Sequence, residues 1–348
     1  MHVKYFQRRV FAIRPQERLP PANPLMLIYF TRRILQSVFT LLVISMILYG
    51  LISSVPGGFM SAYTERADFT PEDLARIRAK FGLDDPIPVR YAKWLVSMLQ
   101  GDMGSSFTTK RPVMEEIADR LPNTLLLMGL MMVCTLLVAI PLGILSAVKQ
   151  YTWFDHIATT AAFAGQSLPV FWFGLLLIIV FAVTLKGGDG RPLLPGSGMY
   201  TLGEPFSLWD RIRHLILPVS MLTFVSAAEY MRYLRSSMLD VIHEDYVRTA
   251  RAKGLRENLV IYKHALRNAI IPLVTLIALD LPALFGGALF TETIFAWPGI
   301  GRLYFTAALK TDYPLVMAIL MIESALIIGS SLLVDFLYAT LDPRIRLS

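Results

Sequence analysis

Residues 124–148 read TLLLMGLMMVCTLLVAIPLGILSAV, a run without a charged side chain. About 20 consecutive apolar residues are enough for a helix to cross the hydrocarbon core of a bilayer, so this stretch predicts a membrane-spanning helix. Five further apolar stretches have a similar length. The six predicted spans lie at about 34–55, 124–148, 157–185, 215–234, 269–290 and 315–339.

Two of these stretches carry features that predict an irregular helix. The third contains Ser167-Leu168-Pro169, and we expect a kink or tilt there because proline removes a backbone donor and clashes with the preceding turn. The fourth is interrupted by Glu229 and Arg232. Both stretches are long enough to cross a bilayer, so the predicted architecture is an all-α polytopic membrane protein with six transmembrane helices.

The composition excludes an ordinary soluble domain. Of 348 residues, 55% are hydrophobic and 17% are charged, whereas soluble domains average about 25% charged residues. The net charge of +7 is typical of cytoplasmic Lys and Arg in a membrane protein. The sequence lacks the interleaved basic and aromatic residues that would indicate nucleic-acid binding. The single cysteine, Cys134, has neither a disulfide partner nor a metal-binding set.

The distribution of Lys and Arg predicts the orientation of the chain. Basic residues gather before the first apolar stretch and again between the fourth and fifth, and such residues mark the cytoplasmic side. Both termini are then cytoplasmic, residues 56–121 form an outer segment, and residues 236–268 form a cytoplasmic loop. Residues 1–26 do not resemble a cleavable signal, so we interpret them as a cytoplasmic extension and residues 27–348 as the transmembrane domain.

The outer segment contains three amphipathic patterns, at residues 70–81, 89–100 and 111–121. The first begins with Thr70 and Pro71, which favour a helix N-terminus. We expect these helices to lie along the outer membrane surface, packed against lipid or against the spans.

Motifs of catalysis and of nucleotide binding are missing from the sequence. It contains no GxxxxGK[ST] phosphate-binding loop, no HExxH and no pair of cysteines, and its five histidines have no metal-ligand spacing. The sequence therefore predicts a chain that has no ATPase site of its own and binds no metal or cofactor. It favours transport, or a membrane scaffold, over an enzyme.

Three acidic residues lie near the middle of predicted spans: Glu229, Asp280 and Glu323. Charged residues within a membrane are costly, so they usually mark a transport pathway or pair with other polar groups. Two interpretations stay open. The acids line a polar cavity for a cationic or zwitterionic solute, or they pair with neighbours such as Arg232 and serve only the structure.

Asp280 is followed by residues that interrupt a helix. Pro282, Gly286 and Gly287 can free backbone carbonyls, and a wet cavity or surrounding protein must then satisfy these groups. The alternative is a helix kinked for packing, in which the glycines allow close approach. We assign Glu229, Asp280, Gly286, Gly287 and Glu323 to a predicted translocation pathway.

The predicted cytoplasmic loop contains YVRTARAKGL (246–255), a basic segment between two apolar stretches. Residues 236–258 have helical periodicity, and Gly254 is a natural helix stop. One predicted stripe carries Leu239, Ile242, Tyr246 and Ala250. We therefore expect a terminated helix that is held against the membrane on one face and exposed to the cytoplasm on the other.

The exposed face of this helix predicts a protein partner. Arg248, Arg251 and Lys253 lie off the apolar stripe, where they can meet acidic groups, and Ala250 and Gly254 leave a small-residue surface for a partner side chain. The alternative is that the arginines only follow the charge rule for cytoplasmic loops.

The sequence resembles the integral membrane subunits of ABC importers, and in particular the B-type permease of the peptide, dipeptide and nickel branch. The general motif has Glu-Ala-Ala before its glycine, whereas the matching positions here are Arg248, Thr249 and Ala250. The resemblance covers about residues 27–348. Its segments are YVRTARAKGL, HALRNAIIP (264–272), GDMGSSF (101–107), LPNT (121–124), PLGILSA (141–147), ETIFAWPGIGRL (292–303), DYPLV (312–316) and LDPRIR (341–346).

This resemblance implies a type I ABC importer permease fold and a heterodimer with a second homologous permease subunit. It also implies an extracytoplasmic solute-binding protein and two cytoplasmic ATPase subunits that bind ATP and Mg. The loop helix would insert into an ATPase cleft and rock the spans when the ATPases close. The implied coupling residues are Tyr246, Arg248, Thr249, Ala250, Arg251, Ala252, Lys253, Gly254 and Leu255.

Two other classes of protein remain alternatives: an ion-coupled secondary transporter or channel, and a non-transporting scaffold. If the loop helix is a lever, a bulky residue at Gly254 or a reversed charge at Arg251 should uncouple ATP hydrolysis from uptake.

Overall fold

The computed structural model describes residues 24–55, 84–188, 190–286 and 288–341, together with residues 60, 72 and 78. In these residues every regular element is a helix, and only two isolated β-bridges occur. The helices, with two π-helical segments labelled η, are α1 (Pro24–Ser54), α4 (Ile87–Leu99), α5 (Val113–Val148), α6 (Trp153–Ser167), α7 (Val170–Ile178), η2 (Ile179–Thr184), α8 (Leu208–Ile242), α9 (Asp245–Ala252), α10 (Glu257–Leu259), η3 (Val260–Ala265), α11 (Leu266–Ala269), α12 (Ile271–Asp280), α13 (Ala283–Gly286), α14 (Leu289–Ile294), α15 (Ile300–Leu309) and α16 (Tyr313–Leu341).

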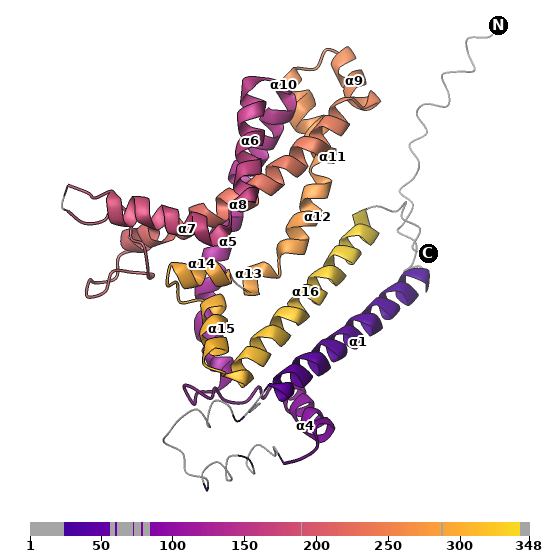
Figure 1. Cartoon of the computed structure of the whole chain (residues 1–348). Coiled ribbons are helices and arrows are strands. Elements are labelled where there is room, and N and C mark those ends of the chain that lie inside the picture. Colours follow the sequence, from indigo (N-terminus) through magenta and orange to yellow (C-terminus); the bar gives the residue numbers. More distant parts are fainter. Residues whose placement is uncertain are drawn as a thin grey trace.

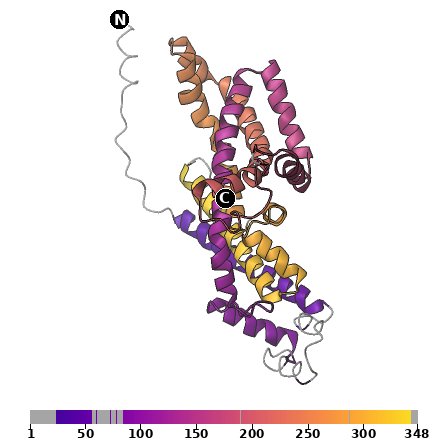
Figure 2. The ribbon, with the colours of Figure 1, turned by 90° about the vertical axis from the view of Figure 1, so that its left-hand side faces the viewer.

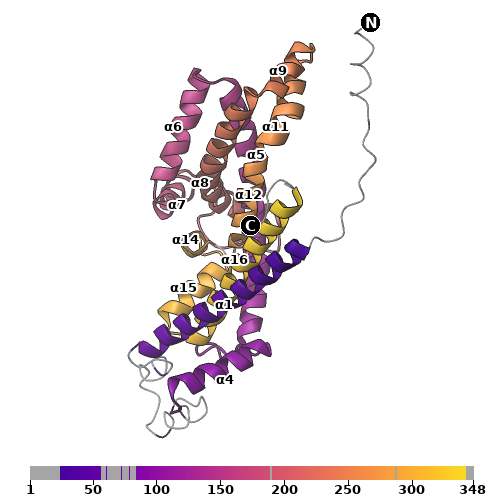
Figure 3. The same ribbon diagram turned by 90° about the vertical axis from the view of Figure 1, so that its right-hand side faces the viewer.

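The molecule is elongated, with α9 at one end and α4 at the other (Figure 1). α5 runs along most of its length and packs against α8 (Figures 1 and 2). The two helices approach closely at Gly143, where a Cβ atom would lie 3.0 Å from the backbone oxygen of Met231 and 3.1 Å from Cβ of Leu234. α1 crosses the molecule beside α16 (Figure 3), and Arg33 Nε of α1 donates to Asp335 of α16 at 2.5 Å.

Within the described residues, four helices are long and apolar enough to cross a membrane: α1, α5, α8 and α16. Two bent helix pairs bring the total to six if each pair is counted as one span. The prediction of an all-helical polytopic membrane protein is confirmed. The number of spans and the cytoplasmic position of both termini stay predictions.

The third predicted span, 157–185, bends at the predicted position, residues 167–169, but the helix breaks there instead of kinking. α6 ends at Ser167, and α7 with η2 continues after a bend of 101°. Leu168 is extended, with φ −80° and ψ 130°. A residue before proline is pushed towards this conformation, so the helix stops rather than kinks at Pro169.

The fifth predicted span, 269–290, is also broken. The segments Glu257–Ala269 and Ile271–Asp280 meet at 48°, with Pro272 in the first turn of α12. α12 then ends at Asp280, and Leu281 and Pro282 form a turn before α13. The predicted interruption at Pro282 is therefore confirmed. Gly286 ends α13, and Gly287 lies outside the described residues.

Of the three amphipathic helices predicted in the outer segment, one is confirmed, one is wrong as a separate helix, and one lies almost entirely outside the described residues. The pattern at 89–100 forms α4, which packs against α1 through Tyr91 and Trp94 beside Tyr49. The pattern at 111–121 is wrong as a separate surface helix, because it forms the first turns of α5. The pattern at 70–81 lies outside the described residues, apart from two positions.

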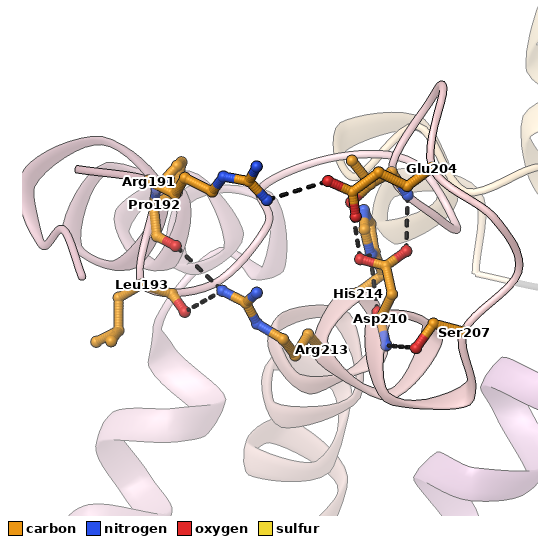
Figure 4. A network of polar contacts seen from close by, with 9 residues as sticks. Arg191, Pro192, Leu193, Glu204, Ser207, Asp210, Arg213 and His214 are labelled. Carbon is orange, nitrogen blue, oxygen red and sulfur yellow. Dashed lines mark hydrogen bonds and ion pairs between the residues drawn. The ribbon is translucent and has the colours of Figure 1, made fainter. Parts of the chain in front are cut away.

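The segment between η2 and α8 is fastened by polar contacts from the first turns of α8 (Figure 4). Asp210 accepts from Thr201 N and from Thr201 Oγ1, each at 2.7 Å. Arg213 donates to the carbonyls of Pro192 and Leu193, at 3.2 and 3.0 Å. These contacts fix the start of α8, where the backbone N–H of Asp210 also donates to Oγ of the N-cap residue Ser207.

Candidate functional site

The basic segment of the loop forms α9, a separate short helix at one end of the molecule (Figure 1). The predicted helix over 236–258 is wrong in extent, because the chain breaks at His243–Glu244 and again after Ala252. Val247 is completely buried and Ala250 is 6% exposed, in a cluster with Met238 of α8 and Val260 of η3. α9 is therefore seated on the helix bundle, which means that its buried face packs against α8 and η3.

The buried face of α9 differs from the predicted stripe. Val247 and Ala250 face inwards, whereas Tyr246 is 40% exposed and its hydroxyl accepts from Asn268 Nδ2 at 2.7 Å. The short break before α9 changes the helical phase, so Leu239 and Ile242 belong to α8. Because Ala250 is buried within this chain, its assignment to a surface for a partner side chain is wrong.

Gly254 ends α9 as predicted. Its φ is +75°, a left-handed conformation that glycine adopts at little cost, and its N–H donates to the carbonyl of Arg251 at 2.9 Å. A Cβ atom at this position would meet nothing within 4 Å. Gly254 therefore stops the helix and leaves open space beside its end.

The cations of α9 are exposed but not equivalent. Arg248 is 73% exposed in its side chain and pairs with Asp245 at 3.3 Å, an exposed contact that contributes little. Arg251 donates to Glu257 at 2.8 Å and to the carbonyl of Ile242 at 3.4 Å, and its pairing with Glu257 raises its pKa. Arg251 therefore stabilises the fold of this loop, a role that the sequence did not indicate. Its side chain also stays partly exposed, so it can contact a partner.

This internal pair makes reversal of Arg251 an ambiguous experiment by itself. We expect Arg251→Glu to reduce uptake partly through repulsion by Glu257. The double variant Arg251→Glu/Glu257→Arg restores the pair, so uptake that returns with it identifies the internal contact. Arg248→Glu leaves this pair intact and reports on the outward face. The measurement is solute uptake in vesicles, at equal amounts of inserted subunit.

Asp280 meets a residue of another helix at the end of α12. Its carboxylate accepts from the hydroxyl of Tyr230 on α8 at 2.5 Å, although Asp280 itself is exposed. Glu229 is also exposed in this chain. The contact joins α8 to the break between α12 and α13.

Glu323, the third of these acids, is not joined to Asp280 or Tyr230 by a hydrogen bond among the described residues. Glu323 is half-buried in α16, and within the described part of the chain it makes neither a hydrogen bond nor an ion pair. Arg232 lies 5.6 Å over the ring of Phe163. It forms no ion pair with Glu229, Asp280 or Glu323 among the described residues.

A buried carboxylate that the sequence analysis missed lies between α5, α14 and α15. Glu292 is fully buried; it accepts from Thr124 Oγ1 at 2.9 Å and from the backbone N–H of Arg302 at 3.0 Å. Burial raises the pKa of Glu292, and these hydrogen bonds oppose the rise. Gly299 and Gly301 make room for the carboxylate, since a Cβ on Gly299 would lie closer than 3.0 Å to its atoms.

A second missed carboxylate is Asp155 at the start of α6. It is 2% exposed, and Arg235 of α8 donates to both of its oxygens at 2.7 Å. A third is Asp312, which accepts from Ser106 Oγ at 2.5 Å and from the N–H of Phe107 at 3.0 Å. Glu292 and Asp312 each lie in a segment that carries the family resemblance, and this position was the only clue in the sequence. Asp155 lies in none of these segments.

The described residues contain no group of three or more His, Cys, Asp or Glu side chains that could hold a metal ion. The candidate functional features of this part of the chain are the seated basic helix, the Tyr230–Asp280 contact at a helix break, and a set of buried carboxylates that join helices.

Comparison with known proteins identifies the family that has this arrangement of membrane helices and a basic loop helix. Residues 139–347 match the binding-protein-dependent transport system inner membrane components, and residues 26–128 match the N-terminal part of such membrane components. The chain belongs to this family: it is a multi-pass inner-membrane protein and a permease subunit of the ABC importer class. The assignment does not favour an ion-coupled transporter.

Particular relatives are similar over almost the whole chain. The oligopeptide transport system permease protein AppB of Bacillus subtilis (strain 168) is 43% identical over 319 residues, which cover 91% of this chain and 99% of AppB. The dipeptide transport system permease protein DppB of Escherichia coli (strain K12) is 38% identical over 336 residues, covering 92% and 99% of the two chains. DppB of Alkalihalophilus pseudofirmus is 36% identical over 334 residues, covering 92% and 100%.

Proposed function

We propose that this subunit forms half of a translocation pathway for peptides and couples ATP hydrolysis by partner subunits to their uptake. A second homologous permease subunit forms the other half, two cytoplasmic ATPase subunits bind ATP and Mg, and an extracytoplasmic binding protein delivers the solute. This chain contributes no ATPase site and binds no cofactor. The names of the similar permeases support peptides as the solute class.

The geometry of α9 supports the coupling role most directly. A helix that transmits displacement has to be rigid, and α9 is seated by Val247 and Ala250 and ended by Gly254. Its exposed residues carry cations that can meet acidic groups on an ATPase. Closure of the ATPases would then push α9, and α8 would carry the movement into the membrane, where the pathway alternates between inward and outward access.

Co-purification tests this proposal. The tagged subunit, expressed with the ATPase subunits and the second permease, is expected to retain the ATPases. A variant in which residues 246–255 are replaced by a Gly/Ser linker is expected to lose them while it still inserts and retains the second permease. ATP-independent uptake by the purified chain alone would instead favour an ion-coupled transporter, and neither binding nor uptake would favour a scaffold.

We further propose that the pathway includes Glu229, Asp280, Gly286, Gly287 and Glu323. The hydrogen bond from Tyr230 to Asp280 at the end of α12 supports a polar position beside a helix break, where a peptide ammonium group could contact the carboxylate. The exposed position of Glu229 in this chain, next to Tyr230, supports its inclusion.

Asp280→Asn is expected to reduce uptake of cationic peptides more than uptake of neutral peptides, by roughly tenfold, the effect of losing one charge-assisted hydrogen bond of about 1.5 kcal/mol. Tyr230→Phe retains the carboxylate and removes only the hydroxyl, so it is the matched control. Competition uptake with lysine-containing and neutral dipeptides gives the ratio. An equal loss for both peptides in Asp280→Asn would assign Asp280 to structure alone.

A further inference from the structure

An ion pair between the buried Asp155 of α6 and the partly buried Arg235 joins α6 to α8, one of the helices that seat α9. The Asp155 carboxylate receives two hydrogen bonds of 2.7 Å from the Arg235 guanidinium, one from Ser146 Oγ of α5, and one of 3.0 Å from the backbone N–H of Tyr151. A bidentate guanidinium–carboxylate pair fixes both the distance and the relative angle of the two side chains. The Asp155–Arg235 clamp, as we name this pair, therefore joins the α5–α6 turn to α8.

Residues beside the clamp in the sequence and the buried face of α9 belong to one packed cluster. Val247 and Ala250 of α9 pack in a cluster that contains Leu234 and Met238 of α8, which flank Arg235 in the sequence. The same cluster contains Ala147, the residue after Ser146. A displacement of α9 would therefore act on α8 near Arg235, and α6 is joined to this region by the clamp.

Stability is a weak explanation for such a pair. Desolvation of two charges offsets most of their attraction, and a well-packed apolar replacement is often as stable or more stable. What the ion pair adds is a defined geometry, because the carboxylate is satisfied only when α5, α6 and α8 hold one arrangement.

We propose that Asp155 and Arg235 are positioning residues for coupling. The clamp makes the α5–α6 turn and α8 move with α9 as one rigid body when the ATPases close. This inference rests on the proposed coupling role of α9. It assigns to the clamp the transmission of movement from α8 to α6, whose far end leads through the 101° bend into α7.

α7 in turn packs closely on α8, so a movement carried through α6 would reach this contact. A Cβ atom on Gly174 of α7 would lie 2.5 Å from Sδ of Met221 and 3.5 Å from Cε2 of Phe295. α7 also contacts α14. A rotation of α6 relative to α8 would strain this contact, so the clamp determines whether the two helices move together or shear.

The first test measures solute imported per ATP hydrolysed by the complete importer in proteoliposomes. In Asp155→Asn and Arg235→Lys this ratio is expected to fall about tenfold, the usual scale of a coupling energy of 1–3 kcal/mol. Arg235→Lys retains the charge and removes the bidentate geometry. Lys149→Gln removes an exposed cation from the same turn and is expected to keep the wild-type ratio.

A neutral double variant separates coupling from folding. Asp155→Asn/Arg235→Gln leaves no unpaired buried charge and retains hydrogen-bonding groups, so it should fold even where a single variant does not. A merely structural role would lower uptake and ATP hydrolysis together and leave their ratio unchanged. A folded double variant with the wild-type ratio would overturn the proposal.

The second test measures rigidity directly by electron spin resonance. Spin labels replace the exposed residues His156 on α6 and Asp240 on α8, in the complete importer with Cys134→Ser. The distance between the labels should not change on ATP binding in the parent protein. In the double variant, ATP binding should broaden or shift the distribution of distances between the labels. A distance that changes in the parent protein contradicts the rigid body.

The two levels of inference fail differently. If α9 does not couple, replacement of residues 246–255 leaves the parent importer's ratio unchanged, and the proposed function fails. If α9 couples but the clamp does not position α6, the α9 variants import less solute per ATP hydrolysed, whereas the clamp variants keep the wild-type ratio.

Discussion

Gly301→Ala is expected to leave almost no folded subunit in the membrane, although it adds one methyl group. A Cβ at residue 301 would lie 2.8 Å from both the backbone nitrogen and Cα of Leu289, and it would lie 3.1 Å from Oε2 of Glu292. The backbone of α14 cannot turn aside as a side-chain tip can. Overpacking costs about 1–3 kcal/mol, and leaving a buried polar group without a hydrogen bond costs about 1–3 kcal/mol or more, so the sum approaches the lower end of the stability of many domains.

Gly129→Ala is the matched control for this prediction. Gly129 lies within α5, and a Cβ there would meet nothing within 4 Å. Alanine favours a helix over glycine by about 1 kcal/mol, so this variant should be as stable as the wild type or more stable. Thermal unfolding of both variants in detergent, followed by size-exclusion chromatography, gives the comparison. A Gly301→Ala variant that melts like the wild type would mean that α14 and α15 separate easily.

Gly254→Leu is expected to abolish uptake while the subunit inserts and the partner ATPases continue to hydrolyse ATP. Its φ of +75° is unfavourable for leucine by about 1–2 kcal/mol, so the end of α9 should shift. A Cβ atom at residue 254 would have no atom of this chain within 4 Å. The added side chain therefore projects into open space beside the exposed end of the helix. A loss of at least roughly tenfold in solute imported per ATP corresponds to a coupling energy above 1.4 kcal/mol.

Gly254→Asn distinguishes the helix stop from the space beside it. Asparagine tolerates the left-handed conformation, so it should end α9 in the same place and retain most of the coupling. Gly254→Ala adds only the strain of a Cβ and should fall between the two. Normal coupling in Gly254→Leu would exclude the end of α9 as a contact with an ATPase.

Much of the fold followed from local sequence. The apolar run at 124–148 predicted a span and lies within α5, and Gly254 and Pro282 mark helix interruptions where they were expected. These features depend on backbone conformation and on composition within a few residues. The severity of the bend at Pro169 was not predictable, because it depends on the packing of α7 against α8 and α14.

The candidate site was predicted only in part for a related reason. The sequence placed cations and a glycine on α9, but it gave the wrong buried face, because a two-residue break before Asp245 changes the helical phase. It also treated Arg251 as available to a partner, since Glu257 lies beyond the turn and no periodicity relates the two residues.

By itself the sequence determined that this chain is a helical membrane protein with a basic, terminated loop helix, because helix formation and burial in lipid depend on local composition. Only the tertiary structure decided which polar residues meet. Thr124 finds Glu292 at a separation of 168 residues, Asp155 finds Arg235 at 80, and Ser106 finds Asp312 at 206. Lipid is as apolar as a neighbouring helix, so hydrophobic periodicity does not reveal which face is packed; only the helix crossings bring these side chains together.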